Sequence, residues 1–160
     1  MHRLLHLVLF TSIFITISQA QQAQPAVPYS EAELQRRTFN FFWELADSNA
    51  QIPDRWPTPA FSSIAATGFG LSSYLVGVEH GWITREQAAE RVLKTLKLLY
   101  ELPQGAATNG MAGYRGFFYH FLDHQKARRF KDVELSTIDS GLLLAGVLSC
   151  QSYFDQNNPT

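Results

Sequence analysis

Two long segments of this chain are apolar on nearly every side, and this pattern constrains the fold more than any other feature of the sequence. Residues 62–78 contain no charged side chain, and residues 136–153 contain only Asp139. A helix without a polar face has to be buried on most sides, so both segments are predicted to be inner helices. Glycines in the first of them, such as Gly68, weaken an isolated helix but allow close packing.

An amphipathic helix is predicted before each inner segment. The first begins after Ser30 and the second after Thr84, and each of these residues is followed three positions later by a glutamate or glutamine that completes a capping box. Both helices have one apolar and one charged face, so one side of each is predicted to meet water. The order outer, inner, outer, inner predicts an all-α chain of about four helices.

The connecting segments are predicted to be irregular, with one exception. The prolines in residues 48–61 rule out a regular helix there, whereas alternating large side chains predict a short β-hairpin around 116–131. Helical hairpins of one outer and one inner helix build a double-layered toroid, and six of them at this spacing would need about 400 residues. The sequence therefore predicts either a small four-helix bundle or the N-terminal third of something larger, truncated at its C-terminus.

The composition is that of a globular protein. Hydrophobic residues make up 46% and charged residues 17% of the 160 residues, which excludes a disordered chain. The formal net charge of −1 gives no reason to expect nucleic acid as a partner. The aromatic fraction of 13% indicates either a large core or a cleft that binds sugars. The single cysteine, Cys150, cannot form an internal disulfide and is predicted to be a buried apolar residue.

Residues 1–20 have the layout of a secretory signal peptide. A basic start at Arg3 precedes an apolar run that ends in small residues up to Ala20. Cleavage there predicts a periplasmic or extracellular protein, with a flexible leader at 21–29 and the folded domain at 30–160. The alternative is an uncleaved anchor, for which the apolar run is short. After cleavage no membrane span is expected.

Four blocks of sequence together carry a resemblance to a known family. They are TFNFFWELAD (38–47), IPDRWPTPAFSSIAATGFGLSSYLVGVEHGWITREQAAERVL (52–93), GYRGFFYHFLD (113–123) and VELSTIDSGLLLAGVLSCQSYFD (133–155). The chain resembles the N-terminal part of the bacterial glucoamylase-like family, which includes the endo-β-1,2-glucanases of glycoside hydrolase family 144. The resemblance implies an (α/α)6 toroid, secretion, and hydrolysis of a β-linked glucan by paired carboxylates without a cofactor.

Two acids, Glu134 and Asp139, stand at the start of the second inner segment. Glycosidases use two carboxylates, one that protonates the leaving oxygen and one that activates water or attacks the sugar. The chain between these acids can span the separation found in inverting or in retaining enzymes, so both mechanisms stay open. The other interpretation is that Asp139 completes a capping box with Ser136 and that Glu134 is a solvated loop residue. Both roles can coexist, because a capping acid can also face substrate.

The proline-rich loop is a predicted sugar-binding region. Asp54 and Arg55 can hydrogen-bond sugar hydroxyls, and Trp56 can stack on a pyranose ring through its flat apolar face. The alternative is a surface Asp54–Arg55 pair beside a core tryptophan.

The segment GYRGFFYHF is the other predicted sugar-binding region. Its candidate residues are Tyr114, Arg115, Tyr119 and His120. The alternative is that the aromatic side chains pack in the core and that the histidine has a structural role.

These features predict a secreted glycoside hydrolase that acts on a β-glucan, with β-1,2-glucan as the best single candidate and Asp139 and Glu134 as the carboxylates. No metal-binding spacing, phosphate loop or nucleophile elbow is present, so neither a metal nor a cofactor is predicted. The alternative belongs to another class: a secreted helical module that binds a glycan or a protein without catalysis, in which the acids only cap helices.

Overall fold

The structure is a computed structural model that describes residues 29–48, 50–57 and 59–155. The described residues from 35 onward form one compact unit. The predicted signal peptide and the leader up to residue 28 lie outside the described residues, and both stay predictions.

Four helices lie in the described part of the chain. They are α2 (Glu31–Glu44), α3 (Ile64–Glu79), α4 (Arg85–Glu101) and α5 (Thr137–Phe154). The sequence predicts four helices in these positions along the chain, and the structure confirms them. None of the four is long and apolar enough to cross a membrane.

Each helix begins where a hydroxyl side chain can accept a free backbone N–H. Ser63 caps α3, Ser136 caps α5, and Thr84 forms the predicted capping box of α4 with Gln87. At the start of α2, the hydroxyl of Ser30 accepts the N–H of Glu33 at 3.2 Å. These caps satisfy the N–H groups that the first turn of a helix leaves unpaired.

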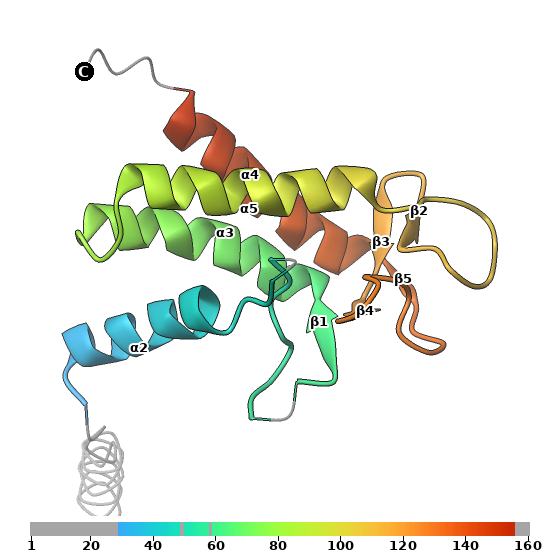
Figure 1. Cartoon of the computed structure of the whole chain (residues 1–160), viewed down its shortest axis with the longest axis horizontal. Coiled ribbons are helices and arrows are strands. Elements are labelled where there is room, and N and C mark those ends of the chain that lie inside the picture. The colour runs from blue at the N-terminus through green and yellow to red at the C-terminus, as the bar shows by residue number, and fades with distance from the viewer. Residues whose placement is uncertain (1–28, 49, 58, 156–160) are drawn as a thin grey trace, which may run out of the picture. The chain divides into compact units, whose positions relative to one another are not determined.

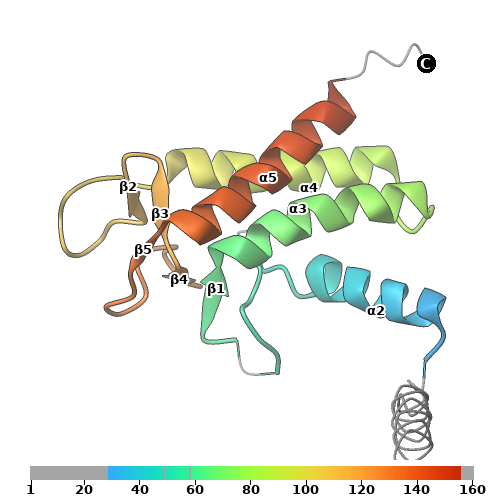
Figure 2. The same cartoon turned by 180° about the vertical axis from the view of Figure 1, so that it is seen from behind.

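Five short strands add to the all-α architecture that the sequence predicts. They are β1 (Phe61–Ser63), β2 (Gly113–Tyr114), β3 (Phe117–Tyr119), β4 (Phe121–Asp123) and β5 (Leu135–Ser136). Strand β1 pairs with β4, and β3 pairs with both β2 and β5, in every case antiparallel. Both views show the strands gathered at the end of the helices where α3 and α5 begin (Figure 1, Figure 2).

The hairpin predicted around 116–131 is right only in part. The chain does turn back after β4, where Leu122 forms an antiparallel bridge with Arg129 and the carboxylate of Asp123 accepts three backbone N–H groups. The consecutive strands β3 and β4, however, belong to different sheets. Strand β3 instead makes a hairpin with β2 across Arg115 and Gly116, whose φ angles of 51° and 87° suit the right-handed twist of a two-residue turn.

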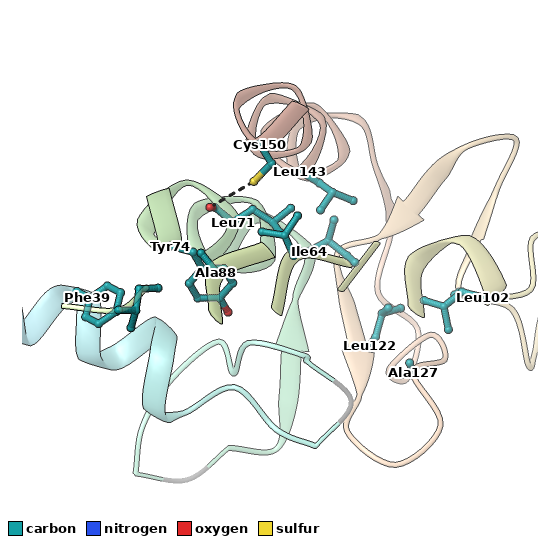
Figure 3. Close-up of a cluster of buried hydrophobic side chains, with 13 residues drawn as sticks. Phe39, Ile64, Leu71, Tyr74, Ala88, Leu102, Leu122, Ala127, Leu143 and Cys150 are labelled. Atoms are coloured by element: carbon teal, nitrogen blue, oxygen red, sulfur yellow. Dashed lines mark hydrogen bonds between the residues drawn. The ribbon is translucent and has the colours of Figure 1, made fainter. Parts of the chain in front are cut away.

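The two inner helices, α3 and α5, cross at glycines. A Cβ added at Gly68 would lie 2.7 Å from the Cα of Leu143, and one added at Gly146 would overlap the backbone of Gly68. The backbones therefore touch directly, which is the close packing that the glycines predict. The core spreads from this crossing through Ile64 and Leu71, as Figure 3 shows.

The burial of α5 differs from the prediction for an inner helix. Leu143, Gly146 and Cys150 are buried, but Leu144 and Leu148 are more than half exposed. The helix is apolar all round, yet within the described residues only one side of it is packed. The sequence pattern indicates how apolar a helix is. Whether both sides of the helix are buried depends on which other elements pack against it.

The thiol of Cys150 is buried, as the sequence predicts, and lies 3.5 Å from the backbone oxygen of Leu71 (Figure 3). Burial raises the pKa of this thiol to about 11. We expect almost no reaction with a thiol-specific disulfide reagent at pH 8 in the folded chain, and full reaction in urea, because the thiolate is the nucleophile. Fast stoichiometric labelling of the native protein would contradict the buried position.

Candidate active site

The carboxylates of Glu134 and Asp139 meet at one histidine. Nδ1 of His120 lies 2.8 Å from Oε1 of Glu134, and Nε2 of the same ring lies 3.6 Å from Oδ1 of Asp139. The first contact is a hydrogen bond, whereas the second is an electrostatic contact just beyond hydrogen-bond length. The structure therefore brings together three of the residues that the sequence singled out.

Asp139 lies in the first turn of α5, where it contacts both the cap residue Ser136 and His120. Its backbone N–H donates to the hydroxyl of Ser136 at 3.1 Å, and that hydroxyl donates to Oδ2 of Asp139. The other oxygen, Oδ1, points to the histidine. Only 14% of the Asp139 side chain is exposed. Each of the two carboxylate oxygens therefore has a different partner: Oδ2 accepts the hydroxyl of the cap residue Ser136, in place of the backbone N–H that a capping box would use, and Oδ1 faces His120. The catalytic role of Asp139 stays a prediction.

Glu134 has a more open environment, with 65% of its side chain exposed. The N–H of its own backbone, and then the imidazole of His120, hold the pKa of Glu134 below its ordinary value. A carboxylate that accepts such hydrogen bonds is favoured in its charged form. The two acids therefore sit in different environments, one open and ionised and the other mostly enclosed.

The backbone of His120 is fixed by hydrogen bonds to the chain segments on both sides of it. Its backbone N–H donates to the backbone oxygen of Glu134 at 3.0 Å, and its own backbone oxygen accepts the N–H of Ile64 at 3.2 Å. The ring also stacks on Phe121, with 3.7 Å between the centroids. His120 is thereby held between Ile64, the first residue of α3, and Glu134, the residue before β5.

The proline-rich loop reaches the same end of the helices. Asp54 and Arg55 form an ion pair at 2.7 Å, and the guanidinium lies 5.3 Å from the ring centre of Phe61. The ring of Phe61 packs on the ring of Phe121, with 4.4 Å between their centroids, and His120 stacks on Phe121 as well. A continuous set of contacts therefore joins this loop to the acids. Trp56 is 58% exposed, so it is not the core residue of the alternative interpretation.

The remaining predicted residues, Tyr114, Arg115 and Tyr119, lie in β2, in β3 and in the turn between them. Arg115 lies over the ring of Tyr114 at 5.1 Å in the β2–β3 turn. Tyr119 packs against the core and has the guanidinium of Arg129 over its ring at 4.6 Å. Within the described residues no hydrogen bond or ion pair joins these three residues to Glu134 or Asp139, although Tyr119 pairs with Leu135, the residue after Glu134. Their role in sugar binding stays a prediction.

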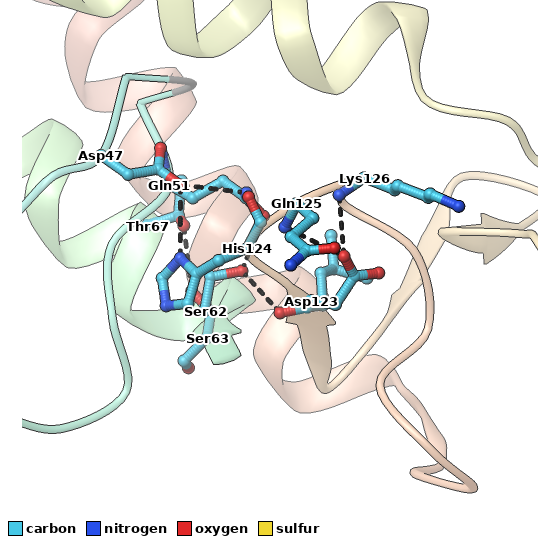
Figure 4. A network of polar contacts seen from close by, with 10 residues as sticks. Asp47, Gln51, Ser62, Ser63, Thr67, Asp123, His124, Gln125 and Lys126 are labelled. Carbon is cyan, nitrogen blue, oxygen red and sulfur yellow. Dashed lines mark hydrogen bonds and ion pairs between the residues drawn. The ribbon is translucent and has the colours of Figure 1, made fainter. Parts of the chain in front are cut away.

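A second polar network was not evident from the sequence (Figure 4). Asp47 lies 3.2 Å from Nδ1 of His124 and also accepts both the backbone and the side-chain N–H of Gln51. Gln51 in turn donates to the backbone oxygen of His124 and accepts the hydroxyl of Ser62. No signal in the sequence could have found these pairs, because Asp47 and His124 are separated by 77 positions. The network ties the proline-rich loop to β1 and to the end of β4.

No metal-binding group is found in the described part of the chain. There, no three His, Cys, Asp or Glu side chains are close enough together to hold an ion.

Comparison with known proteins points to enzymes that act on β-1,2-linked glucose. No family model matches the chain. An exo beta-1,2-glucooligosaccharide sophorohydrolase from Parabacteroides distasonis is 28% identical over 133 residues, which cover 78% of this chain and 17% of that protein. A solved beta-1,2-glucanase from the same species is 26% identical with a TM-score of 0.67, over 82% of this chain and 19% of its own.

A third match supports the fold alone. The endo-beta-1,2-glucanase from Chitinophaga pinensis, solved with sophorotriose and glucose, is 22% identical with a TM-score of 0.64, over 78% of this chain and 31% of its own. The chain thus has the local fold of glucoamylase-like β-1,2-glucanases, and the resemblance that the sequence indicates is confirmed. It spans less than a fifth of the length of its curated relative.

Proposed function

We propose that this chain forms part of a secreted hydrolase of β-1,2-glucan and belongs to an (α/α)6 toroid whose cleft lies at the strand end of α3 and α5. The observation that carries the proposal is the meeting of Glu134 and Asp139 at His120, directly before and within the first turn of α5. The similarity to two β-1,2-glucan hydrolases supports the choice of substrate.

The environments of the two acids suggest separate roles. Glycoside hydrolysis needs one carboxylic acid to protonate the leaving oxygen and one carboxylate as base or nucleophile. Glu134, whose pKa is lowered, suits the ionised role. Asp139, of whose side chain only 14% is exposed, is assigned the role of the acid, because glycoside hydrolysis needs a second carboxyl group beside the ionised one.

The substitution Asp139→Asn tests this assignment. Asparagine keeps the shape of the side chain and caps helices well, but it cannot donate a proton as an acid. We expect hydrolysis of linear β-1,2-glucan, measured as newly formed reducing ends, to fall about 10²–10⁴-fold. Binding of a β-1,2-glucooligosaccharide, measured by calorimetry, should be retained.

A matched control uses the other end of the same helix. Asp155→Asn removes the exposed C-cap carboxylate of α5 and should leave hydrolysis unchanged. Equal turnover of Asp139→Asn and wild type would show that Asp139 is not the acid. Specific oligosaccharide binding without any turnover by the whole protein that contains this chain would instead favour the non-catalytic binding module.

A further inference from the structure

The proline-rich loop is held on a short antiparallel stem. The N–H of Ser63 donates to the backbone oxygen of Ile52 at 3.1 Å. The N–H of Asp54 donates to the backbone oxygen of Phe61, also at 3.1 Å. Residues 52–54 therefore run antiparallel to β1, which pairs with β4 as well. Because both ends of the loop belong to this small sheet, the sheet determines where the residues that follow Asp54 lie.

The two faces of the small sheet have different surroundings. Successive side chains of a strand point to opposite faces, so Ser62 and Phe61 lie on different sides. Ser62 is buried together with Leu122, its partner on β4. Phe61 packs on Phe121 and has the guanidinium of Arg55 near its ring. The buried face therefore anchors the loop, whereas the other face carries the contacts that lead to the acids.

Gln51 fastens the buried face through its side-chain amide, as Figure 4 shows. The amide nitrogen donates to Oδ2 of Asp47 and to the backbone oxygen of His124, each at 3.2 Å. The amide oxygen accepts the hydroxyl of Ser62 at 2.9 Å. Only 3% of Gln51 is exposed, so its loss would leave buried polar groups without these bonds. An amide suits the position because it combines two N–H donors with an acceptor, whereas a carboxylate has no donor.

We propose that Gln51 is a positioning residue that fixes the proline-rich loop, so that Arg55 and Trp56 are preorganised to bind a glucosyl unit of the glucan. The proposal rests on the proposed function. Gln51 is followed directly by Ile52, the first residue of the stem, so the buried amide and the stem are fixed together. Trp56 is 58% exposed and offers a flat apolar face to a sugar ring, while Arg55 offers N–H donors to its hydroxyls.

The stem reaches the sugar-binding candidates through one residue. Asp54 belongs to the stem by its backbone N–H, and its carboxylate holds the guanidinium of Arg55 at 2.7 Å. Side chains that become ordered only when the sugar binds lose conformational freedom at that moment, which weakens the affinity. The Gln51 amide thus acts through the loop on substrate affinity and not on bond cleavage. Its loss should change KM and Kd but not kcat.

The substitution Gln51→Met tests this role in the whole protein that contains this chain. Methionine is unbranched like glutamine, but its thioether cannot donate a hydrogen bond and accepts only weakly. We expect KM for linear β-1,2-glucan to rise about 10-fold, while kcat stays within about 2-fold. The Kd of a β-1,2-glucooligosaccharide, measured by calorimetry, should rise by the same factor. Unchanged KM and Kd in the folded variant would overturn the proposal.

A matched control lies in the neighbouring turn. Gln125→Met makes the same chemical change at an exposed position directly after His124. KM, kcat and Kd should all stay at their wild-type values in this variant. If Gln125→Met raised Kd as much as Gln51→Met does, the effect would not come from the buried amide and the proposal would be wrong.

A double-mutant cycle with Trp56→Ala separates positioning from a general loss of stability. Trp56→Ala removes the proposed stacking surface itself, so on that background the loss of Gln51 has less left to disturb. We expect Gln51→Met to raise Kd about 10-fold in the presence of Trp56 but less than about 3-fold in its absence. Fully additive effects would show that Gln51 does not act through the loop.

Ser62→Ala decides the question if Gln51→Met does not yield a folded protein. This substitution removes one hydroxyl of the network and leaves both donors of the Gln51 amide in place. We expect a smaller rise of Kd in the same direction, about 3-fold, that again depends on Trp56. A folded Ser62→Ala protein with the wild-type Kd would contradict the positioning role.

The two proposals can fail separately. If Asp139→Asn abolishes turnover but Gln51→Met leaves KM and Kd unchanged, the role of Gln51 is wrong and the proposed function stands. If the protein binds the oligosaccharide with the expected coupling of Gln51 and Trp56 but does not cleave it, the hydrolase function fails. The positioning role then stands for sugar binding alone.

Discussion

Gly146→Ala should destabilise the chain by about 2 kcal/mol, as the net of a packing loss of about 3 kcal/mol and a helix-propensity gain of about 1 kcal/mol. The new Cβ would overlap the carbonyl oxygen of Gly68 and would lie 2.9 Å from its Cα. These are backbone atoms inside α3, so the clash cannot be relieved by rotating a side chain. The inner helices would have to move apart.

The measurement is urea unfolding followed by helical circular dichroism, and Gly141→Ala is the matched control on the same helix. A Cβ at Gly141 meets no atom within 4 Å, so there the alanine should be neutral or stabilise by about 0.5–1 kcal/mol. If the two variants were equally stable, α3 and α5 would not be in backbone contact at Gly68 and Gly146.

The isolated chain should self-associate. The double substitution Leu144→Lys and Leu148→Lys should weaken this association and raise its dissociation constant at least 10-fold. These side chains lie one turn apart on α5 and are 56% and 53% exposed. Two hollows of about 430 and 600 Å³ lie between α5 and α4 and are lined mainly by apolar side chains, with Arg115, Thr137 and Ser140 in the first and Gln151 in the second as the polar exceptions. Burial of one leucine contributes about 1.5–3 kcal/mol, so this surface favours association in water.

Sedimentation velocity across a concentration series measures the effect, together with binding of a fluorescent apolar dye. Ser152→Lys is the control, because it adds a positive charge to an exposed position of α5 without removing an apolar side chain. A wild-type chain that stays monomeric at high concentration and binds no dye would contradict the prediction.

The arrangement at His120 shows why the site was only partly predictable. Glu134 and Asp139 could be chosen from the sequence, because they adjoin and enter a segment, 136–153, in which Asp139 is the only charged side chain. The sequence predicts a sugar-binding role for His120, which stays a prediction, but it does not predict that this ring lies between the two acids. That position depends on the pairing of β3 with β5, in which Tyr119 lies opposite Leu135 and Phe118 opposite Ser136.

The polar network around Gln51 was missed for a similar reason. Gln51 and Ser62 are buried polar residues that bond to each other and to groups on β4 and after it. Nothing in a local pattern distinguishes such a glutamine from an exposed one. Buried polar groups take partners wherever the fold offers them, and the nearest are often far along the chain.

The sequence by itself determined where the helices begin and which of them are apolar all round. Caps at Ser30, Thr84 and Ser136 and the periodicity of the apolar residues act over three or four positions, so they can be identified without knowledge of the fold. The tertiary structure alone decided which strands pair, which face of α5 is covered, and which side chain lies between the two acids. Those outcomes arise from contacts between segments far apart in the chain, whose free energies no local pattern contains.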